Sequence, residues 1–346
     1  MNAPIRFPRD TPPEEGAAIE LAEGVLWMRL PLPMKLDHVN VYAFADEDGG
    51  WTIVDTGLDS RRTRAIWQKL LDGPLAGRRV RRVIVTHHHP DHVGLAGWFQ
   101  REHGAALVTT RTAWLFARML QLDEQMVPVD ETLAYWRSAG MDEAIFEARR
   151  AQRPMNYVDM VAEMPLGFRR IKEGSRVRFG GRDWDVRIGN GHAPEHATLW
   201  SRDCDLVIGG DQLLATISPN LGVYATEPEA DPVGDWLESC ERLSAFADDR
   251  HLVLPGHKLP FTGLPARMRQ LIDNHHGGLA RLTGYLTEPK TAVECFPVLY
   301  KRTIGAGDYG LALVEAMGHL NHLYHAGIVT RDTRADGAYL WRRRDV

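Results

Sequence analysis

The stretch Thr86-His87-His88-His89-Pro90-Asp91-His92 decides the fold class of this chain. It gathers four imidazoles and one carboxylate within the six positions from His87 to His92. The apolar stretch before it, residues 80–85, predicts a buried strand, and residues 93–99 predict the start of a helix. Side chains at strand ends meet in the crevice where α/β proteins place their chemistry. Because imidazole and carboxylate groups bind zinc-like ions, the stretch predicts a metal site.

The same local pattern recurs further along the chain, with an apolar strand, a sharp turn containing glycine, and a His or Asp. The residues at these positions are Asp55, His192, Asp211 and His257. A histidine run on the surface would not follow a buried strand, nor would the pattern return at other strand ends. We therefore expect these four residues to share one site with the histidine run.

Composition narrows the class of protein and its compartment. The chain has 346 residues, 44% of them hydrophobic and 25% charged, which is typical of globular proteins. A net charge of −5 argues against nucleic acid or an anionic membrane as the main partner. The three cysteines are far apart, and neither a secretory signal nor a run of 18 apolar residues is visible. We expect a cytoplasmic protein with no membrane segment.

The periodicity of apolar residues predicts an α+β fold in three segments. Residues 1–18 are rich in proline and charge and predict an N-terminal arm. Residues 19–264 alternate short strands and helices and predict the catalytic domain, with a helical insertion at about 112–165. Residues 265–346 predict a linker helix followed by helices and a β-hairpin, which is the plan of a small winged-helix domain.

The order of residues within the histidine run separates two sets of ligands. One turn can aim His87 and His89 at a first ion, while Asp91 and His92 reach a second. His88 alternates away from both and is expected to pack or hydrogen-bond elsewhere. Downstream, His196 is expected to support the site without binding metal, and its neighbour Glu195 to make a local structural contact.

Together with Asp55-Thr56-Gly57, His192, Asp211 and His257, the run resembles the motifs of the metallo-β-lactamase superfamily over residues 20–262. The resemblance implies an αββα sandwich of two mixed sheets with two metal ions at one edge. The implied ligands are His87, His89 and His192 for the first ion, Asp91, His92 and His257 for the second, and Asp211 bridging both. The implied ions are two Zn²⁺, with Fe or Mn as alternatives at the same ligands.

The resemblance also implies the chemistry. In binuclear members a metal-bound hydroxide attacks a carbonyl. The catalytic candidates are therefore Asp91, Asp211 and Asp55, the last by accepting a hydrogen bond from a ligand imidazole. The tail resembles the winged-helix extension of the subgroup that includes human β-lactamase-like protein 2. Residues 311–322 contain no Lys or Arg to neutralise phosphates, so we expect packing or dimerisation rather than DNA binding.

The substrate pocket is predicted from the helical insertion and two loops. The insertion either packs as a structural element or forms a lid whose apolar wall faces the substrate. The side chains of such a wall would be Trp114, Phe116, Met119, Tyr135, Trp136 and Tyr157. Further candidates are His38, near the pocket mouth, and Ser218 and Asn220, which follow Asp211.

The leading hypothesis is a binuclear metal hydrolase of thioesters or esters, as in glyoxalase II-like members, because the apolar insertion suits a small acyl substrate. Lactone or β-lactam hydrolysis is the alternative within the same chemistry. Two alternatives belong to other classes: an iron-dependent persulfide dioxygenase, and a DNA-binding regulator that uses the winged helix. The sequence leaves open the substrate, the metal bound in vivo and the oligomeric state, a homodimer included.

Overall fold

The computed structural model describes residues 4–300 and 302–344. The chain folds into two compact units. Among these residues, the first unit comprises the stretches up to 124, 156–219 and 243–268. The second comprises 125–155, 220–242 and the chain from 269 onward. The predicted insertion at 112–165 is therefore divided between the units, because its last two helices belong to the second.

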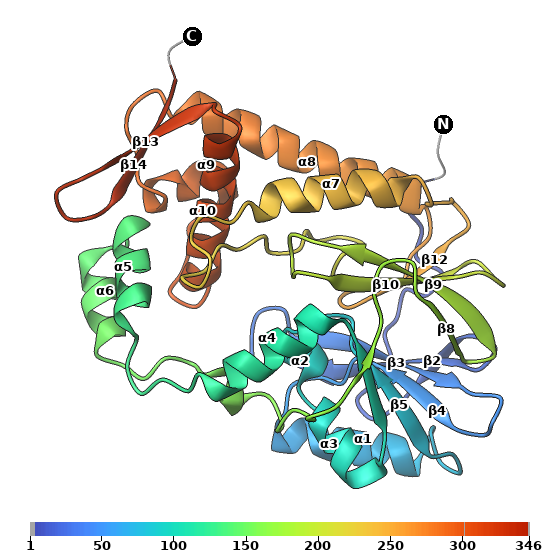
Figure 1. Cartoon of the computed structure of the whole chain (residues 1–346). Helices are drawn as coiled ribbons and strands as arrows, with labels where there is room; N and C mark the ends of the chain where they lie inside the picture. Colours follow the sequence, from blue (N-terminus) through green and yellow to red (C-terminus); the bar gives the residue numbers. More distant parts are fainter. Residues whose placement is uncertain (1–3, 301, 345–346) are drawn as a thin grey trace. The chain divides into compact units, whose positions relative to one another are not determined.

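The first unit contains a seven-stranded mixed sheet whose strands follow one another in chain order (Figure 1). The strands are β1 (Ile19–Ala22), β2 (Val25–Pro31), β3 (His38–Ala45), β4 (Trp51–Val54), β5 (Val80–Ile84), β6 (Ala106–Thr109) and β7 (Arg169–Arg170). Strands β1 to β4 pair antiparallel, and β4 to β7 pair parallel. The parallel half places the residues that follow β4 and β5 at the same edge.

A five-stranded mixed sheet, ordered β12-β11-β10-β9-β8, completes the sandwich. Its strands are β8 (Arg176–Phe179), β9 (Arg182–Gly189), β10 (His196–Ser201), β11 (Leu206–Gly210) and β12 (Leu252–Pro255). Gly180 and Gly181 join β8 to β9 at φ of 59° and 68°, the conformation that a two-residue hairpin turn requires. Only β11 and β12 pair parallel, so their following residues also meet at one edge.

Strand β3 shows how the sequence divides the core into two layers. Val39, Val41 and Ala43 pack on the helical side, whereas Tyr42 and Phe44 pack between the two sheets. This alternation follows the period of two along a strand. Helices α1 (Arg61–Asp72) and α3 (Ala96–His103) cover the outer face of the first sheet, contributing Ile66, Trp67, Leu70 and Phe99. Both faces of this sheet are therefore buried.

Shorter elements connect the sheets. In the first unit these are α2 (Pro90–Val93), α4 (Arg111–Leu122) and the 3₁₀ turn η1 (Tyr157–Asp159). The predicted N-terminal arm is held at several points: Arg6 N–H donates to Thr262 O at 3.2 Å and Thr262 N–H to Arg6 O at 2.9 Å, and Arg62 Nη2 donates to Glu15 Oε2 at 2.6 Å. This stretch of the arm lies against the first unit.

The second unit is mainly helical. Its elements are α5 (Asp130–Ser138), α6 (Glu143–Arg150), η2 (Val293–Cys295), α9 (Phe296–Tyr300), α10 (Tyr309–His325), β13 (Val329–Thr333) and β14 (Tyr339–Arg343). Helices α7 (Pro232–Ser244) and α8 (Leu264–Tyr285) each cross the boundary between the units. The prediction of an α+β fold with two mixed sheets and a small C-terminal domain is confirmed.

Candidate metal centre

The turn after β5 is built on hydrogen bonds to Asp55, which follows the adjacent parallel strand β4. Thr86 donates to the Asp55 carboxylate twice, from N–H to Oδ1 and from Oγ1 to Oδ2, both at 2.8 Å. His92 Nδ1–H donates to the same Oδ2 at 2.8 Å. Asp55 therefore joins the beginning and the end of the histidine run.

These hydrogen bonds decide which ring nitrogens carry lone pairs toward the site. Thr86 Oγ1 gives its proton to Asp55, so at 3.0 Å it accepts from His87 Nδ1–H. His92 likewise uses Nδ1–H on Asp55, and His257 Nδ1–H donates to His38 O at 2.8 Å. In all three imidazoles, Nε2 is left as the metal-binding nitrogen.

The seven predicted ligands come together in space. Among the described residues, their ligand atoms form three groups in which all atoms lie within 4.8 Å of one another. The groups are His87, His89 and His192; Asp91, His92 and His257; and His87, His92 and Asp211. The first two reproduce the two sets expected from the sequence, and the third joins one residue of each set to Asp211.

Asp211 lies between the two sets. Its Oδ2 is 3.4 Å from His192 Nε2 and 3.1 Å from His257 Nε2, and its Oδ1 is 3.5 Å from His92 Nε2. This carboxylate is 5% exposed. A carboxylate that faces imidazoles of both sets has the position that a bridging ligand needs.

The backbone around Asp211 leaves no room for a larger neighbour. A Cβ on Gly256 would lie 2.0 Å from Asp211 Oδ1, so a glycine must precede His257. On the other side, Asp211 N–H donates to His196 Nε2 at 3.0 Å. Burial lowers the pKa of His196 to about 3, so His196 is a neutral acceptor that holds the Asp211 backbone. This is the supporting role expected of His196.

The charges of the cluster suit a cation. Burial lowers the pKa of His87 and His89 well below the ordinary value, and neighbouring imidazoles lower it further, so both rings are neutral. Burial alone would raise the pKa of Asp211, but the His257 and His92 imidazoles outweigh it and hold that pKa well below its usual range. The site thus offers the neutral imidazoles of His87 and His89 beside the ionised carboxylate of Asp211, whereas the Asp211 and Asp91 carboxylates, against the effect of burial, raise the pKa of His92 and His257.

The donor set also passes a test of fit for two metal ions. His92 Nε2 and Asp211 Oδ1 are buried and lack a hydrogen-bond partner among the described residues. Buried polar atoms without a partner are costly unless another group satisfies them. Nitrogen and oxygen donors in tight groups are the coordination that zinc-like ions prefer. These residues therefore fit a binuclear metal centre.

His88 is absent from the three ligand groups, as the alternation along the run predicts. Its ring packs against Phe116 of α4, with centroids 4.9 Å apart, and burial lowers its pKa to about 3. Tyr157 donates a hydrogen bond from its hydroxyl to His88 O. His88 thus links the histidine run to α4 and η1.

The structure brings some of the predicted pocket residues to the centre. Tyr157 contacts the histidine run, and His38 lies against His257 with ring centroids 6.3 Å apart. Trp114 stacks on Phe168 at 4.9 Å and donates to Pro165 O, so it packs within the first unit.

Met119 and Ser218 have exposed side chains, and the structure does not pack them on the cluster. Asn220 belongs to the second unit, where Nδ2 donates to Leu311 O and Glu315 Oε2. The two remaining aromatic residues of the predicted wall, Tyr135 and Trp136, lie on α5 in that unit as well.

Sequence reasoning missed the support of the loop that carries His257. Lys258 N–H donates to His38 Nε2 at 2.9 Å, while its carbonyl accepts from Asn40 Nδ2 at 2.9 Å and from Arg29 Nη2 at 2.7 Å. Lys258 has φ of 68°, which is unusual for a residue other than glycine. Asn40 lies on strand β3, and no local signal in the sequence links it to a loop more than 200 residues away.

Glu195 makes the local contact expected of it. Its Oε2 accepts from Thr112 N–H at 2.9 Å and from the Thr112 hydroxyl, which ties the His192 loop to the start of α4. Thr112 was not among the sequence candidates.

Comparison with known families agrees with this geometry. A family model described as "Metallo-beta-lactamase superfamily" matches residues 34–257. The chain belongs to the metallo-β-lactamase superfamily. A second model, described as "Metallo-beta-lactamase-like, C-terminal domain", matches residues 279–344. The resemblance noted from the histidine run is thereby confirmed, and it extends over the tail.

Relatives within the superfamily cover nearly the whole chain. The "Probable metallo-hydrolase YqjP" of Bacillus subtilis (strain 168) is 26% identical over 310 residues, which are 87% of this chain and 92% of the relative. The crystal structure of a beta-lactamase domain protein from Burkholderia ambifaria matches with a TM-score of 0.91 and 36% identity, covering 98% of both chains. A metallo-beta-lactamase family protein from Thermus thermophilus matches with a TM-score of 0.76 and 27% identity, covering 94% of this chain and 100% of that one.

Proposed function

We propose that this chain is a zinc-dependent hydrolase with two metal ions, acting on the carbonyl of a thioester or ester. One observation carries the proposal: Asp211 faces His192 of one ligand set and His257 of the other, at 3.4 and 3.1 Å. Membership of a superfamily that includes a probable metallo-hydrolase supports the same chemistry.

Each residue of the centre has an assigned task. His87, His89 and His192 would hold the first ion, and Asp91, His92 and His257 the second, with Asp211 shared. When bound, two such ions would lower the pKa of a water molecule and polarise the substrate carbonyl. Asp55 and the His38 carbonyl hold His92 and His257 in the tautomers that leave Nε2 available.

An acyl substrate is favoured by the surroundings of the histidine run. Phe116 of α4 lies directly on His88, and Tyr157 reaches the backbone of the same residue. Leu115, Met119 and Leu122 lie on exposed positions of α4, at 50%, 44% and 76% exposure. An apolar helix beside the centre suits a substrate with a hydrocarbon portion.

We propose that the C-terminal segment forms a winged-helix-like unit and that this unit does not bind DNA. Strand β13 pairs antiparallel with β14 after α10, which gives the helix–helix–hairpin order of that fold. No Lys or Arg occurs between Tyr309 and His325 in α10, so this helix cannot neutralise phosphates. We propose that the unit packs within the chain or forms a homodimer contact.

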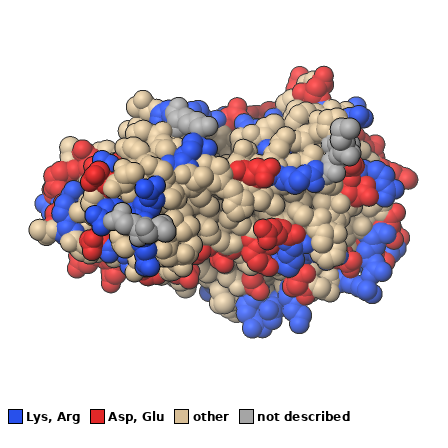
Figure 2. Space-filling model, turned by 90° about the horizontal axis from the view of Figure 1, so that it is seen from above, with Lys and Arg blue, Asp and Glu red and all other residues tan. Residues whose placement is uncertain are grey.

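The surface and the cysteines are consistent with an enzyme of the cytoplasm acting on a small molecule. Figure 2 shows Lys and Arg interspersed with Asp and Glu over the face that it draws. None of the three cysteines forms a disulfide, which suits a reducing compartment. Among the described residues, no helix combines the length and apolar character needed to cross a membrane.

The proposal is tested by metal analysis together with a substrate panel. We expect close to two zinc ions per chain and turnover of thioesters or aryl esters by the zinc-loaded protein. Turnover restricted to lactones or to a chromogenic β-lactam would assign the alternative hydrolase activity. One tightly bound iron with consumption of oxygen would refute the hydrolase and favour a persulfide dioxygenase.

A further inference from the structure

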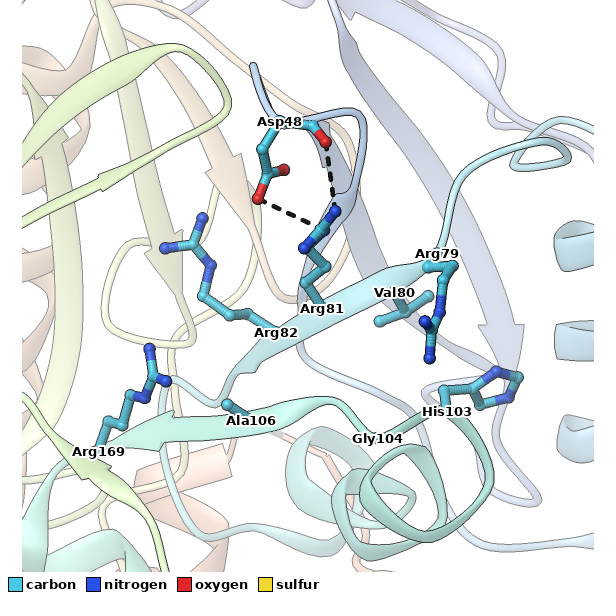
Figure 3. Close-up of a pocket in the computed structure, with 9 residues that line it drawn as sticks. All are labelled: Asp48, Arg79, Val80, Arg81, Arg82, His103, Gly104, Ala106 and Arg169. Atoms are coloured by element: carbon cyan, nitrogen blue, oxygen red, sulfur yellow. Dashed lines mark hydrogen bonds and ion pairs between the residues drawn. The ribbon is translucent and has the colours of Figure 1, made fainter.

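An arginine-rich pocket lies at the opposite ends of the strands from the metal ligands. The ligands follow the C-terminal end of β5, whereas this pocket is built at the N-terminal ends of β5 and β6 (Figure 3). Its volume is about 450 Å³, and its polar lining consists of Asp48, Arg79, Arg81, Arg82, His103 and Arg169. We call this the arginine pocket. It belongs entirely to the first unit.

Two of its four guanidinium groups are engaged by carboxylates. Arg81 lies 3.4 Å from Asp48, and Figure 3 shows it turned toward that residue. Arg82 lies 3.1 Å from Asp46 and also donates to Thr52 Oγ1 at 3.1 Å and to Arg178 O at 3.0 Å. Arg82 is therefore a fixed part of the pocket wall.

Among the described residues, no ion pair joins Arg79 or Arg169 to a carboxylate, and Figure 3 draws no contact between either of them and Asp48. Burial lowers the pKa of His103, so His103 adds no positive charge at neutral pH. Four arginines and the two carboxylates Asp46 and Asp48 leave an excess of two positive charges at the arginine pocket. A dianion would balance this excess.

The arginine pocket continues into a smaller apolar recess. This recess has a volume of about 190 Å³, shares Arg82 and Arg169 with the arginine pocket and is also lined by Arg170 and Arg178. Its apolar lining is Ile84, Val108, Ile171, Val177 and Phe179, at the margin between the two sheets. Cationic and apolar surfaces therefore lie side by side, with the two shared arginines at their junction.

We propose that the arginine pocket and its recess bind a small organic phosphate, with two or more negative charges on the arginines and an apolar or aromatic group in the recess. Guanidinium groups match phosphate oxygens with paired N–H donors. Inorganic phosphate alone would leave the apolar surface of the recess uncovered. Because the four arginines lie at the N-terminal ends of the strands, away from the metal ligands, the phosphate site is distinct from the substrate site of the metal centre.

The test is a binding titration by calorimetry on the zinc-loaded full-length protein, using ADP, pyrophosphate and adenosine as probes. We expect saturable binding of ADP, weaker binding of pyrophosphate and none of adenosine. Replacing Arg169 with Ala should weaken ADP binding roughly tenfold, and Arg79→Ala/Arg169→Ala roughly a hundredfold, since each removes a hydrogen bond between charged groups.

Two controls separate binding at the arginine pocket from binding elsewhere on the chain. Arg61→Ala removes an exposed arginine elsewhere in the first unit and should leave ADP affinity unchanged. Asp211→Ala disables the metal centre, so unchanged ADP affinity in that variant places the nucleotide away from the zinc ions. Loss of ADP binding in Asp211→Ala would overturn the proposal. So would the absence of saturable binding, equal affinity for adenosine, full affinity in the double variant, or displacement of ADP by RNA at far lower concentration.

Discussion

Replacing Asp55 with Asn tests whether this buried carboxylate sets the tautomer of a metal ligand. Asn keeps the size of the side chain but replaces one carboxylate oxygen with an N–H donor. If the remaining oxygen stays on Thr86 N–H, the new amide faces Thr86 Oγ1 and His92 Nδ1, both 2.8 Å away. His92 Nδ1 can accept a hydrogen bond from this amide only if the ring proton moves from Nδ1 to Nε2. That is the nitrogen that faces Asp91 and Asp211.

The expected loss of zinc affinity follows from the known effect of a carboxylate that hydrogen-bonds to a ligand imidazole. Loss of a carboxylate behind a ligand imidazole lowers metal affinity roughly 10- to 100-fold, or about 1.4–2.8 kcal/mol. The ion held by His92 should be affected most, because His92 contacts Asp55 directly, whereas His87 reaches Asp55 only through Thr86 Oγ1. We expect two zinc ions per chain in the wild type, and one tight and one weakened ion in the variant.

Competition with a chromogenic zinc chelator measures both affinities, and metal analysis after dialysis gives the stoichiometry. Asp59→Asn is the matched control, because Asp59 accepts from Arg64 Nε and Nη2 at 2.7 and 2.8 Å in the same stretch of chain. It should leave both zinc affinities unchanged. Two zinc ions held by Asp55→Asn as tightly as by the wild type would refute the tautomer argument.

Three further perturbations follow from the same structure. Asp211→Ala should abolish turnover with retention of the fold by circular dichroism, and full activity would exclude a shared ligand. His88→Ala should lower kcat/KM far less than His87→Ala, because His88 is absent from the ligand groups; equal losses would contradict this. Burial raises the pKa of Glu315 to about 7, against an ordinary value of 4.5. The folded state therefore binds this proton more tightly. Its stabilisation, at most about 3 kcal/mol, is complete below pH 4.5 and is lost as the pH rises through 7. Melting temperatures of Glu315→Gln should fall less over this range, and parallel profiles would exclude the effect.

The metal centre could be predicted from the sequence because each of its ligands belongs to a short, recognisable sequence pattern. An apolar strand, a tight turn and a His or Asp are short-range features, and parallel pairing of β4 with β5 and of β11 with β12 brings the following turns together. His88 could be set aside for the same reason, since alternation along a turn is also local. The sandwich of two mixed sheets, by contrast, was predicted from the resemblance to the superfamily that these residues carry.

Local sequence patterns could not predict the hydrogen bonds that support the metal centre or the residues that surround the substrate. Asn40 donates to the carbonyls of Pro255 and Lys258, and Arg29 to that of Lys258, across more than 200 residues of sequence. The insertion was treated as one piece, yet α4 belongs to the first unit and α5 to the second. Apolar periodicity identifies helices, but it does not say which core each helix joins. The pocket residues His38, Trp114, Met119, Tyr157, Ser218 and Asn220 stay predictions.

Backbone strain links the support of the centre to its chemistry. Among the described residues, Asp55, Glu195 and Lys258 are the non-glycine residues with positive φ, at 57°, 50° and 68°. Each lies within three residues of a ligand or touches one, and each is held by hydrogen bonds from another element. A left-handed residue costs about 1–3 kcal/mol unless its surroundings enforce it. The sandwich enforces it at all three turns, so the energy of the fold holds the ligand imidazoles in place before any ion binds.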